Sequence, residues 1–135
     1  MELPDTIVRC TEDPLLELAN DELLDVQLLV VVDAAVADAD HPPGTFTSFR
    51  LDAVTLRSTA SGMDTHTLDV RASLRLAGSL GLLPDDVCVY IVFGNGFGRG
   101  WEVSPPIRAV IPCIARRIEH DVREWLGQKP CTNLE

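Results

Sequence analysis

The hydrophobic and polar positions along this chain change period several times, which predicts alternating strands and helices. Apolar runs of strand length occur at Gln27–Val32 and Val87–Phe93, and a shorter β-rich run occurs at Thr6–Cys10. A strand that is apolar on both faces is usually covered by helices on both sides, so we expect Gln27–Val32 to be a central strand. The run Thr45–Leu51 is β-rich but more polar, which favours a place near an edge of the sheet.

Two segments of helical period separate these strands. Asp13-Pro14 places a capping residue before a proline, and the apolar spacing that follows predicts a helix over Pro14–Leu24. A second helix is expected over Thr67–Leu80, because apolar residues recur there at every fourth position and Gly81 and Pro84 supply stop signals. The apolar positions of this second helix are Leu68, Ala72, Leu76 and Leu80.

The third and longest helical segment follows the last strand. It is announced by Ser104-Pro105, and Pro112 is expected to bend it locally. The loop Gly94–Gly100 before it is glycine-rich, which fits either a mobile lid over an extended substrate peptide or an ordinary loop with aromatic anchors. The apolar stripe of the helix consists of Ile107, Val110, Ile111, Ile114, Ile118, Val122 and Trp125.

This order of elements predicts one layered α/β domain. A chain of 135 residues with 46% hydrophobic residues can fill a single core. No helix fits between Gln27–Val32 and Thr45–Leu51, which favours an antiparallel arrangement of these two and therefore a mixed sheet. We expect a three-layer α/β/α domain over residues 1–127, with a small mixed, mostly parallel sheet, and a polar tail at 128–135.

Composition excludes several classes of protein. The formal net charge of -10 argues against binding to phosphate backbones, so no nucleic acid partner is expected. No apolar run approaches the roughly 20 residues of a membrane helix and the acidic start is no signal peptide, so we expect no membrane association and a cytoplasmic location. The cysteines lack Cys-x-x-Cys spacing and are expected to be reduced, with Cys88 and Cys113 buried and Cys131 in the tail.

Two polar residues stand where secondary structure changes. Asp33 ends the apolar run Leu28–Val32, and His66 stands where a turn leads into the second helix. Such junctions often face ligands in α/β folds, and carboxylate with imidazole suits nickel or zinc. Each residue also has a purely structural interpretation, a turn-capping acid for Asp33 and a locally packed helix residue for His66. The chain contains neither Gly-x-Ser-x-Gly nor His-Glu-x-x-His.

Other polar clusters are best interpreted as solvated surface. His120 and Glu124 stand one helical turn apart, but neighbouring arginines favour an exposed charged face. The cluster Asp38–His41 and the pair Asp85-Asp86 are interpreted as loop acids.

Several segments together resemble one known family, the maturation endopeptidases of nickel-iron hydrogenases, over about Thr6 to Leu126. The segments that carry the resemblance occur in the family's order and spacing. They are Val31-Val32-Asp33-Ala34 at a strand end, Pro43-Gly44-Thr45, His66 opening a helix, Leu80-Gly81-Leu82-Leu83-Pro84 and Val103-Ser104-Pro105-Pro106-Ile107.

The resemblance implies a phosphorylase/hydrolase-like fold and a metal-reading site at the carboxyl edge of the sheet. In the family, a Glu or Asp from an N-terminal glycine-rich loop joins an Asp and a His, and Asp33 and His66 match the last two. The implied metal is nickel carried by the hydrogenase large-subunit precursor, whose C-terminal extension is removed. The protein then needs no cofactor of its own. The resemblance assigns Asp33 and His66 both the metal contact and the catalytic role.

The resemblance departs at the N terminus, where members of the family begin with a strand, a Gly-Asn motif, an acidic loop and a helix. This sequence shows none of them, so a fold truncated at its N terminus is expected, with a gap in the sheet. Thr6–Cys10 sliding against Gln27–Val32, a second subunit on the exposed edge, or an upstream start codon would each repair it. Glu12 is either a substitute third ligand or an acid interacting with a helix dipole.

Two alternatives to an active endopeptidase follow from this departure. One is an inactive, truncated homologue that binds the precursor tail or its nickel as an accessory module. The other is a gene-model fragment of an active enzyme.

Overall fold

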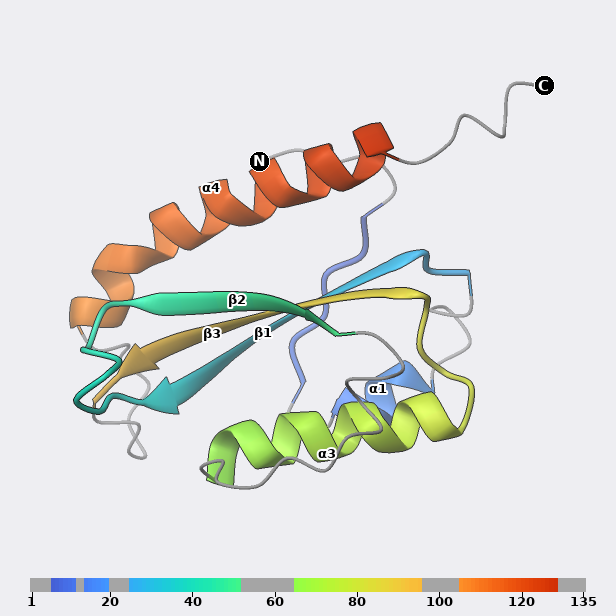
Figure 1. Ribbon diagram of the computed structural model, residues 1–135, viewed down its shortest axis with the longest axis horizontal. Coiled ribbons are helices and arrows are strands. Elements are labelled where there is room, and N and C mark those ends of the chain that lie inside the picture. Colours follow the sequence, from blue (N-terminus) through green and yellow to red (C-terminus); the bar gives the residue numbers. More distant parts are fainter. Residues whose placement is uncertain (1–5, 12–13, 20–24, 52–64, 96–104, 129–135) are drawn as a thin grey trace.

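A small mixed sheet organises the part of the chain that the computed structural model describes, which is residues 6–11, 14–19, 25–51, 65–95 and 105–128. Its strands are β1 (Leu28–Val36), β2 (Phe46–Leu51) and β3 (Asp86–Gly94), in the order β1-β3-β2. β3 pairs with β1 in parallel and with β2 antiparallel (Figure 1). The expected mixed sheet is therefore confirmed, with one parallel and one antiparallel pairing.

The central strand is β3, not the strand that begins after Gln27. Eight of the nine residues of β3 are buried and its first is half-buried, whereas Val32 and Val36 of β1 are 53% and 51% exposed. The prediction that Gln27–Val32 is central was wrong. An apolar sequence alone does not distinguish a strand that is paired on both edges from an edge strand whose valines are partly exposed. The polar strand β2 does lie at an edge, as expected.

Helices cover both faces of this sheet. α4 (Pro105–Gln128) lies over one face, and α3 (Thr65–Ser79) lies over the other together with the short α1 (Pro14–Leu18) (Figure 1). The three-layer α/β/α arrangement is therefore confirmed. α1 was expected to extend to Leu24, but residues 20–24 lie outside the described part of the chain.

Two apolar clusters fill the spaces between the layers. The larger lies between the sheet and α3 and includes Leu18 of α1, while the smaller lies beneath α4. On β3, the alternation of side chains sends Val87, Val89, Ile91 and Phe93 into the larger cluster and Val92 into the smaller.

The buried face of α3 differs from the expected one. Leu74 and Ala77 are fully buried, whereas Leu76 is 47% and Leu80 is 60% exposed. Apolar residues at every fourth position drift around a helix of 3.6 residues per turn, so a stripe at intervals of three and four residues faces the sheet instead. The apolar stripe expected from Leu68 to Leu80 was therefore wrong for the positions whose side chains the structure describes.

The long helix α4 is anchored to β3 by two polar contacts as well as by apolar packing. The Tyr90 hydroxyl donates to Asp121 Oδ2 at 2.7 Å, and Trp125 Nε1 donates to Asp86 Oδ2 at 2.9 Å. The expected stripe holds for Ile107, Ile114 and Trp125, which are buried, but not for Ile111, which is 48% exposed. The helix continues through Pro112.

The N-terminal residues 6–11 form no strand. All six are exposed, and they are therefore unlike a strand held in a sheet. The predicted strand at Thr6–Cys10 was wrong, because a preference for β structure does not by itself place a segment in a sheet. The first of the three repairs of the sheet, in which this segment slides against β1, is not seen.

The free cysteines divide between core and surface. Cys88 is buried within β3, as expected, but Cys113 is exposed on α4. Cys113 was expected to be a small buried hydrophobic residue, but α4 turns that position outward. Cys131, Glu12 and residues 96–100 of the glycine-rich loop lie outside the described residues. Among the described residues, no helix is both long and apolar enough to cross a bilayer.

Substitutions of two leucines of α3 test which face of this helix packs against the sheet. Leu74→Ala should lower the free energy of unfolding by about 2–5 kcal/mol, because it leaves a cavity between α3 and the sheet. Leu76→Ala, which removes the same atoms from an exposed site, should cost less than about 1 kcal/mol. Urea unfolding followed by circular dichroism measures both, and equal losses would show that α3 packs through a different face.

Candidate functional site

Asp33 lies near the carboxyl end of β1, on the side of the sheet that α3 covers. Its register partner on β3 is Ile91, which belongs to the core cluster beneath α3. Val31 and Ala35, two residues to either side, belong to that cluster as well. Asp33 is half-buried. The sequence thus places a carboxylate at the margin of an apolar layer.

His66 is the second residue of α3. Figure 1 shows that the N-terminal end of α3 and the carboxyl end of β1 lie at the same end of the layers. The fold therefore brings the two predicted segments together on one side of the sheet. The side chain of His66 lies outside the described residues, so its contact with Asp33 remains a prediction.

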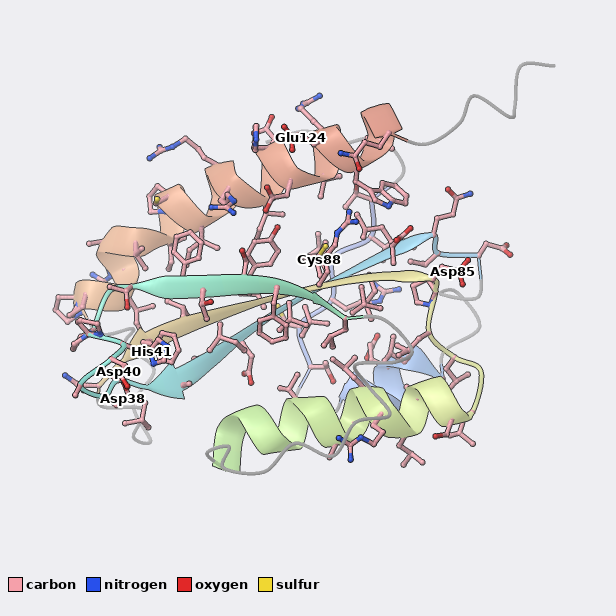
Figure 2. All side chains as sticks on the ribbon, in the orientation of Figure 1. Asp38, Asp40, His41, Asp85, Cys88 and Glu124 are labelled. Atoms are coloured by element: carbon pink, nitrogen blue, oxygen red, sulfur yellow. The ribbon has the colours of Figure 1, made fainter. Side chains whose placement is uncertain are left out.

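The loop between β1 and β2 frames this end of the sheet. Asp38 Oδ1 accepts hydrogen bonds from the backbone amides of Asp40 at 2.9 Å and His41 at 2.8 Å, and lies 3.1 Å from His41 Nδ1. The hydrogen bond from the His41 amide is the main cause that lowers the pKa of Asp38 below its usual value. Figure 2 shows the three residues together beyond the ends of the strands. The loop is therefore held by its own carboxylate.

The ring of His41 also stacks on Phe93, with centroids 4.2 Å apart. This contact joins the loop to the end of β3 and to the apolar layer beneath α3. The cluster Asp38–His41 was predicted to consist of loop acids, and its sequence does not indicate the stacking, because the contact joins residues that are far apart in the chain. The spacing Asp-x-x-His was the local signal for the Asp38 turn.

The next turn, at Pro43-Gly44-Thr45, fixes where β2 begins. Gly44 has φ +84, and its amide donates to the Phe93 carbonyl at 2.8 Å. A Cβ at Gly44 would meet the carbonyl oxygen of Pro106 at 3.3 Å, so the turn also touches the first residues of α4. Glycine is required here by both the backbone angle and the close approach.

The opposite face of the sheet carries a polar cavity of about 330 Å³ between β2, β3 and α4. Tyr90 and Asp121 lie in its wall, and Arg117 Nε reaches both oxygens of Asp121 at 3.1 and 3.2 Å. Burial and the hydrogen bond to Asp121 raise the pKa of Tyr90, so its hydroxyl stays a donor. Because Asp33 faces the other side, this cavity is separate from the predicted site.

The remaining charged groups behave as the sequence suggests. His120 Nε2 lies 3.4 Å from Glu124 Oε1, with side chains 64% and 61% exposed, which confirms a solvated face on α4. The residues that the structure describes contain no group of three or more His, Cys, Asp or Glu arranged to hold a metal ion. This absence does not bear on the predicted pair Asp33 and His66, because the side chain of His66 lies outside the described residues.

Comparison with known proteins gives one family. The family HycI, hydrogenase maturation protease, matches residues 16–121. Comparison with curated proteins finds no match.

Three solved structures share the fold, each at 19% sequence identity. The hydrogenase maturating endopeptidase HybD from E. coli has a TM-score of 0.56, covering 76% of this chain and 62% of its own. A hydrogenase 2 maturation peptidase from Thaumarchaeota archaeon SCGC_AB-539-E09 has a TM-score of 0.53 over 75% of this chain and 68% of its own. The solution structure of an endopeptidase from Escherichia coli has a TM-score of 0.61 over 83% of this chain and 67% of its own. This chain thus spans about two thirds of the length of these neighbours.

Substitutions of three glycines test separately the two constraints on Gly44, the positive backbone angle φ and the close approach to Pro106. Gly44→Ala should lower the free energy of unfolding by about 1–3 kcal/mol, because it combines a left-handed backbone with a close approach to Pro106. Gly81→Ala has a similar angle, φ +73, but open space, so it measures the backbone cost alone.

The helical Gly127→Ala should instead stabilise by about 0.5–1 kcal/mol, because alanine loses less entropy in a helix. Thermal unfolding of the three variants gives the order. A Gly44 variant as stable as the Gly127 variant would contradict the close packing of this turn on α4.

Proposed function

Because this chain belongs to the hydrogenase maturation protease family, we propose that it is an endopeptidase that removes the C-terminal extension of a hydrogenase large-subunit precursor after nickel insertion. The observation that carries the proposal is the placement of Asp33. It lies near the carboxyl end of β1 on the α3 side, at the end of the layers where the first turn of α3 carries His66.

The chemistry of these two residues fits nickel brought by the substrate. A carboxylate and a neutral imidazole are donors that nickel accepts, and two protein donors leave coordination positions open. Nickel that is already held by the precursor can fill those positions with the precursor's own ligands. Asp33 and His66 would then contact the metal only when a loaded precursor is bound, so no resident cofactor is required.

Cleavage itself needs an activated water and a polarised peptide carbonyl. A bound divalent ion supplies both effects, which agrees with a sequence that lacks a serine-hydrolase motif. In this chain, the carboxylate of Asp33 would have a fixed position, because Val31 and Ala35, two residues to either side of it on β1, are packed in the core. The stacked His41 and the Gly44 turn limit movement of the adjoining loop.

A second function, from another class, would use the same two residues. In this alternative the chain is a module that binds the precursor tail or its nickel through Asp33 and His66 without cutting it. A cytoplasmic location and the absence of nucleic acid and membrane partners stay predictions.

Cleavage of a nickel-loaded precursor by this chain tests the proposal directly. Loss of the C-terminal extension should be seen by mass spectrometry of the precursor, and metal-free precursor should stay intact. Binding of the loaded precursor without cleavage, under conditions where a longer relative cuts, would favour the accessory module. Neither binding nor cleavage would reject both functions.

Substitutions at the site should separate it from the rest of the surface. Asp33→Asn and His66→Gln should each lower the cleavage rate by about 10²-fold or more, since each removes a donor to the metal. Asp85→Asn and His120→Gln are matched controls, because Asp85 lies at the opposite end of the sheet (Figure 2) and His120 on the outer face of α4. Unchanged cleavage in the first two variants would remove both residues from the site.

A further inference from the structure

Backbone and ring contacts hold His41 in place, although its side chain is 44% exposed. Its amide donates to Asp38 Oδ1 at 2.8 Å, and its carbonyl accepts a hydrogen bond from the Asp38 amide at 3.0 Å. Its ring stacks on that of Phe93, with the two ring planes 15° apart. The fold thus fixes both the position and the plane of an imidazole that solvent can reach.

The contact with Asp38 also decides which nitrogen of the ring carries the proton. The pKa of Asp38 is lowered, chiefly by the hydrogen bond from the His41 amide, so this carboxyl group is ionised near neutral pH. An ionised carboxylate only accepts hydrogen bonds, so His41 Nδ1, 3.1 Å from Asp38 Oδ1, must be the donor. In the neutral ring, Nε2 is therefore a hydrogen-bond acceptor. Within the part of the chain that the structure describes, no group donates to it.

His41 lies at the end of the sheet that carries Asp33. Its stacking partner, Phe93, pairs with Ala35, two residues along β1 from Asp33, and side chains two residues apart on a strand share a face. From the usual spacings within and between strands, the backbones of Asp33 and Phe93 are about 8 Å apart. Figure 2 shows His41 at the end of the layers where Figure 1 shows the first turn of α3. His41 therefore borders the place where Asp33 and His66 are proposed to meet the metal.

We propose that His41 is a further catalytic residue, whose Nε2 takes a proton from the water that attacks the precursor. This role rests on the proposed function. As the water oxygen bonds to the carbonyl carbon of the peptide, a proton passes to Nε2 and an electron pair moves to the carbonyl oxygen. The carbonyl then forms again, the C–N bond breaks, and the imidazolium gives the proton to the leaving nitrogen. The ring ends as it began, and one water is consumed for each bond cut.

Asp38 is the positioning residue for this step. A carboxylate beside Nδ1 keeps the proton off Nε2 before the reaction and stabilises the imidazolium that forms during it. The stacking on Phe93 limits rotation of the ring, so Nε2 keeps its direction. His120 differs, because its own Nε2 lies 3.4 Å from Glu124 Oε1, on the helix that covers the opposite face of the sheet.

Cleavage of nickel-loaded precursor by the full chain tests the role of His41. His41→Gln should lower kcat by about 10²–10⁴-fold, the usual contribution of a general base, and should leave KM nearly unchanged. His120→Gln is the matched control, because it removes the other described imidazole that faces a carboxylate, and it should cleave like the wild type. A loss confined to KM would give His41 a binding role and would overturn the inference.

Asp38→Asn tests the positioning role. This variant should lower kcat by about tenfold or more, because asparagine does not hold the proton on Nδ1. Asp40→Asn, which removes a charge from the same loop, should not. Nitrogen-15 NMR of the full chain without precursor provides a readout besides activity: the neutral ring of His41 should carry its proton on Nδ1, and Asp38→Asn should increase the share on Nε2. A wild-type ring with the proton on Nε2 overturns the inference.

The outcomes separate this role from the proposed function. Cleavage by His41→Gln at the wild-type rate overturns the role of His41 and leaves the proposed function standing. A wild-type chain that binds loaded precursor without cutting it rejects both. If circular dichroism shows that His41→Gln does not fold, His41→Ala with added free imidazole decides the question. Partial recovery of the rate supports the inference, and no recovery overturns it.

Discussion

The burial of β3 is the constraint on which the rest of the structure depends. This strand makes hydrogen-bonded ladders on both of its edges and packs both of its faces into apolar layers. A buried backbone group without a partner costs about as much as a lost hydrogen bond, so β1 and β2 must both be present for β3 to be buried. At the carboxyl end of the sheet, the ends of β1 and β3 lie beside the turn that leads into β2.

The two polar contacts between β3 and α4 fix the other layer. Tyr90 and Trp125 each bury an aromatic body and give their single donor to a carboxylate. These bonds set the position of α4 along the strand, while Ile107 and Ile114 supply the apolar contact. The start of α4 packs against the Gly44 turn. The position of α4 therefore also constrains the end of the sheet that carries Asp33.

Elements with a strong local pattern were predicted well. The strand Val87–Phe93 and the start of α4 at Pro105 are found within a residue of the expected bounds, and the α/β class and mixed sheet are confirmed. The errors concern segments whose secondary structure or place in the sheet depends on residues that are distant in the sequence. Thr6–Cys10 has strand-like residues but forms no strand. The sequence of β1 predicts a central strand, although no strand lies beside its outer edge in the described part of the chain. His41 on Phe93 could not be found from spacing, because the two residues are far apart in sequence.

The fold gives Asp33 a fixed position, because Val31 and Ala35 on either side of it are packed in the core beneath α3. The proposed function makes use of this fixed position. A carboxylate and an imidazole that contact a metal held by another molecule would gain that contact only when the metal is present. Discrimination between a loaded and an empty precursor would then come from the coordination positions that the metal still has open, and it would not need a high affinity of this protein for free metal.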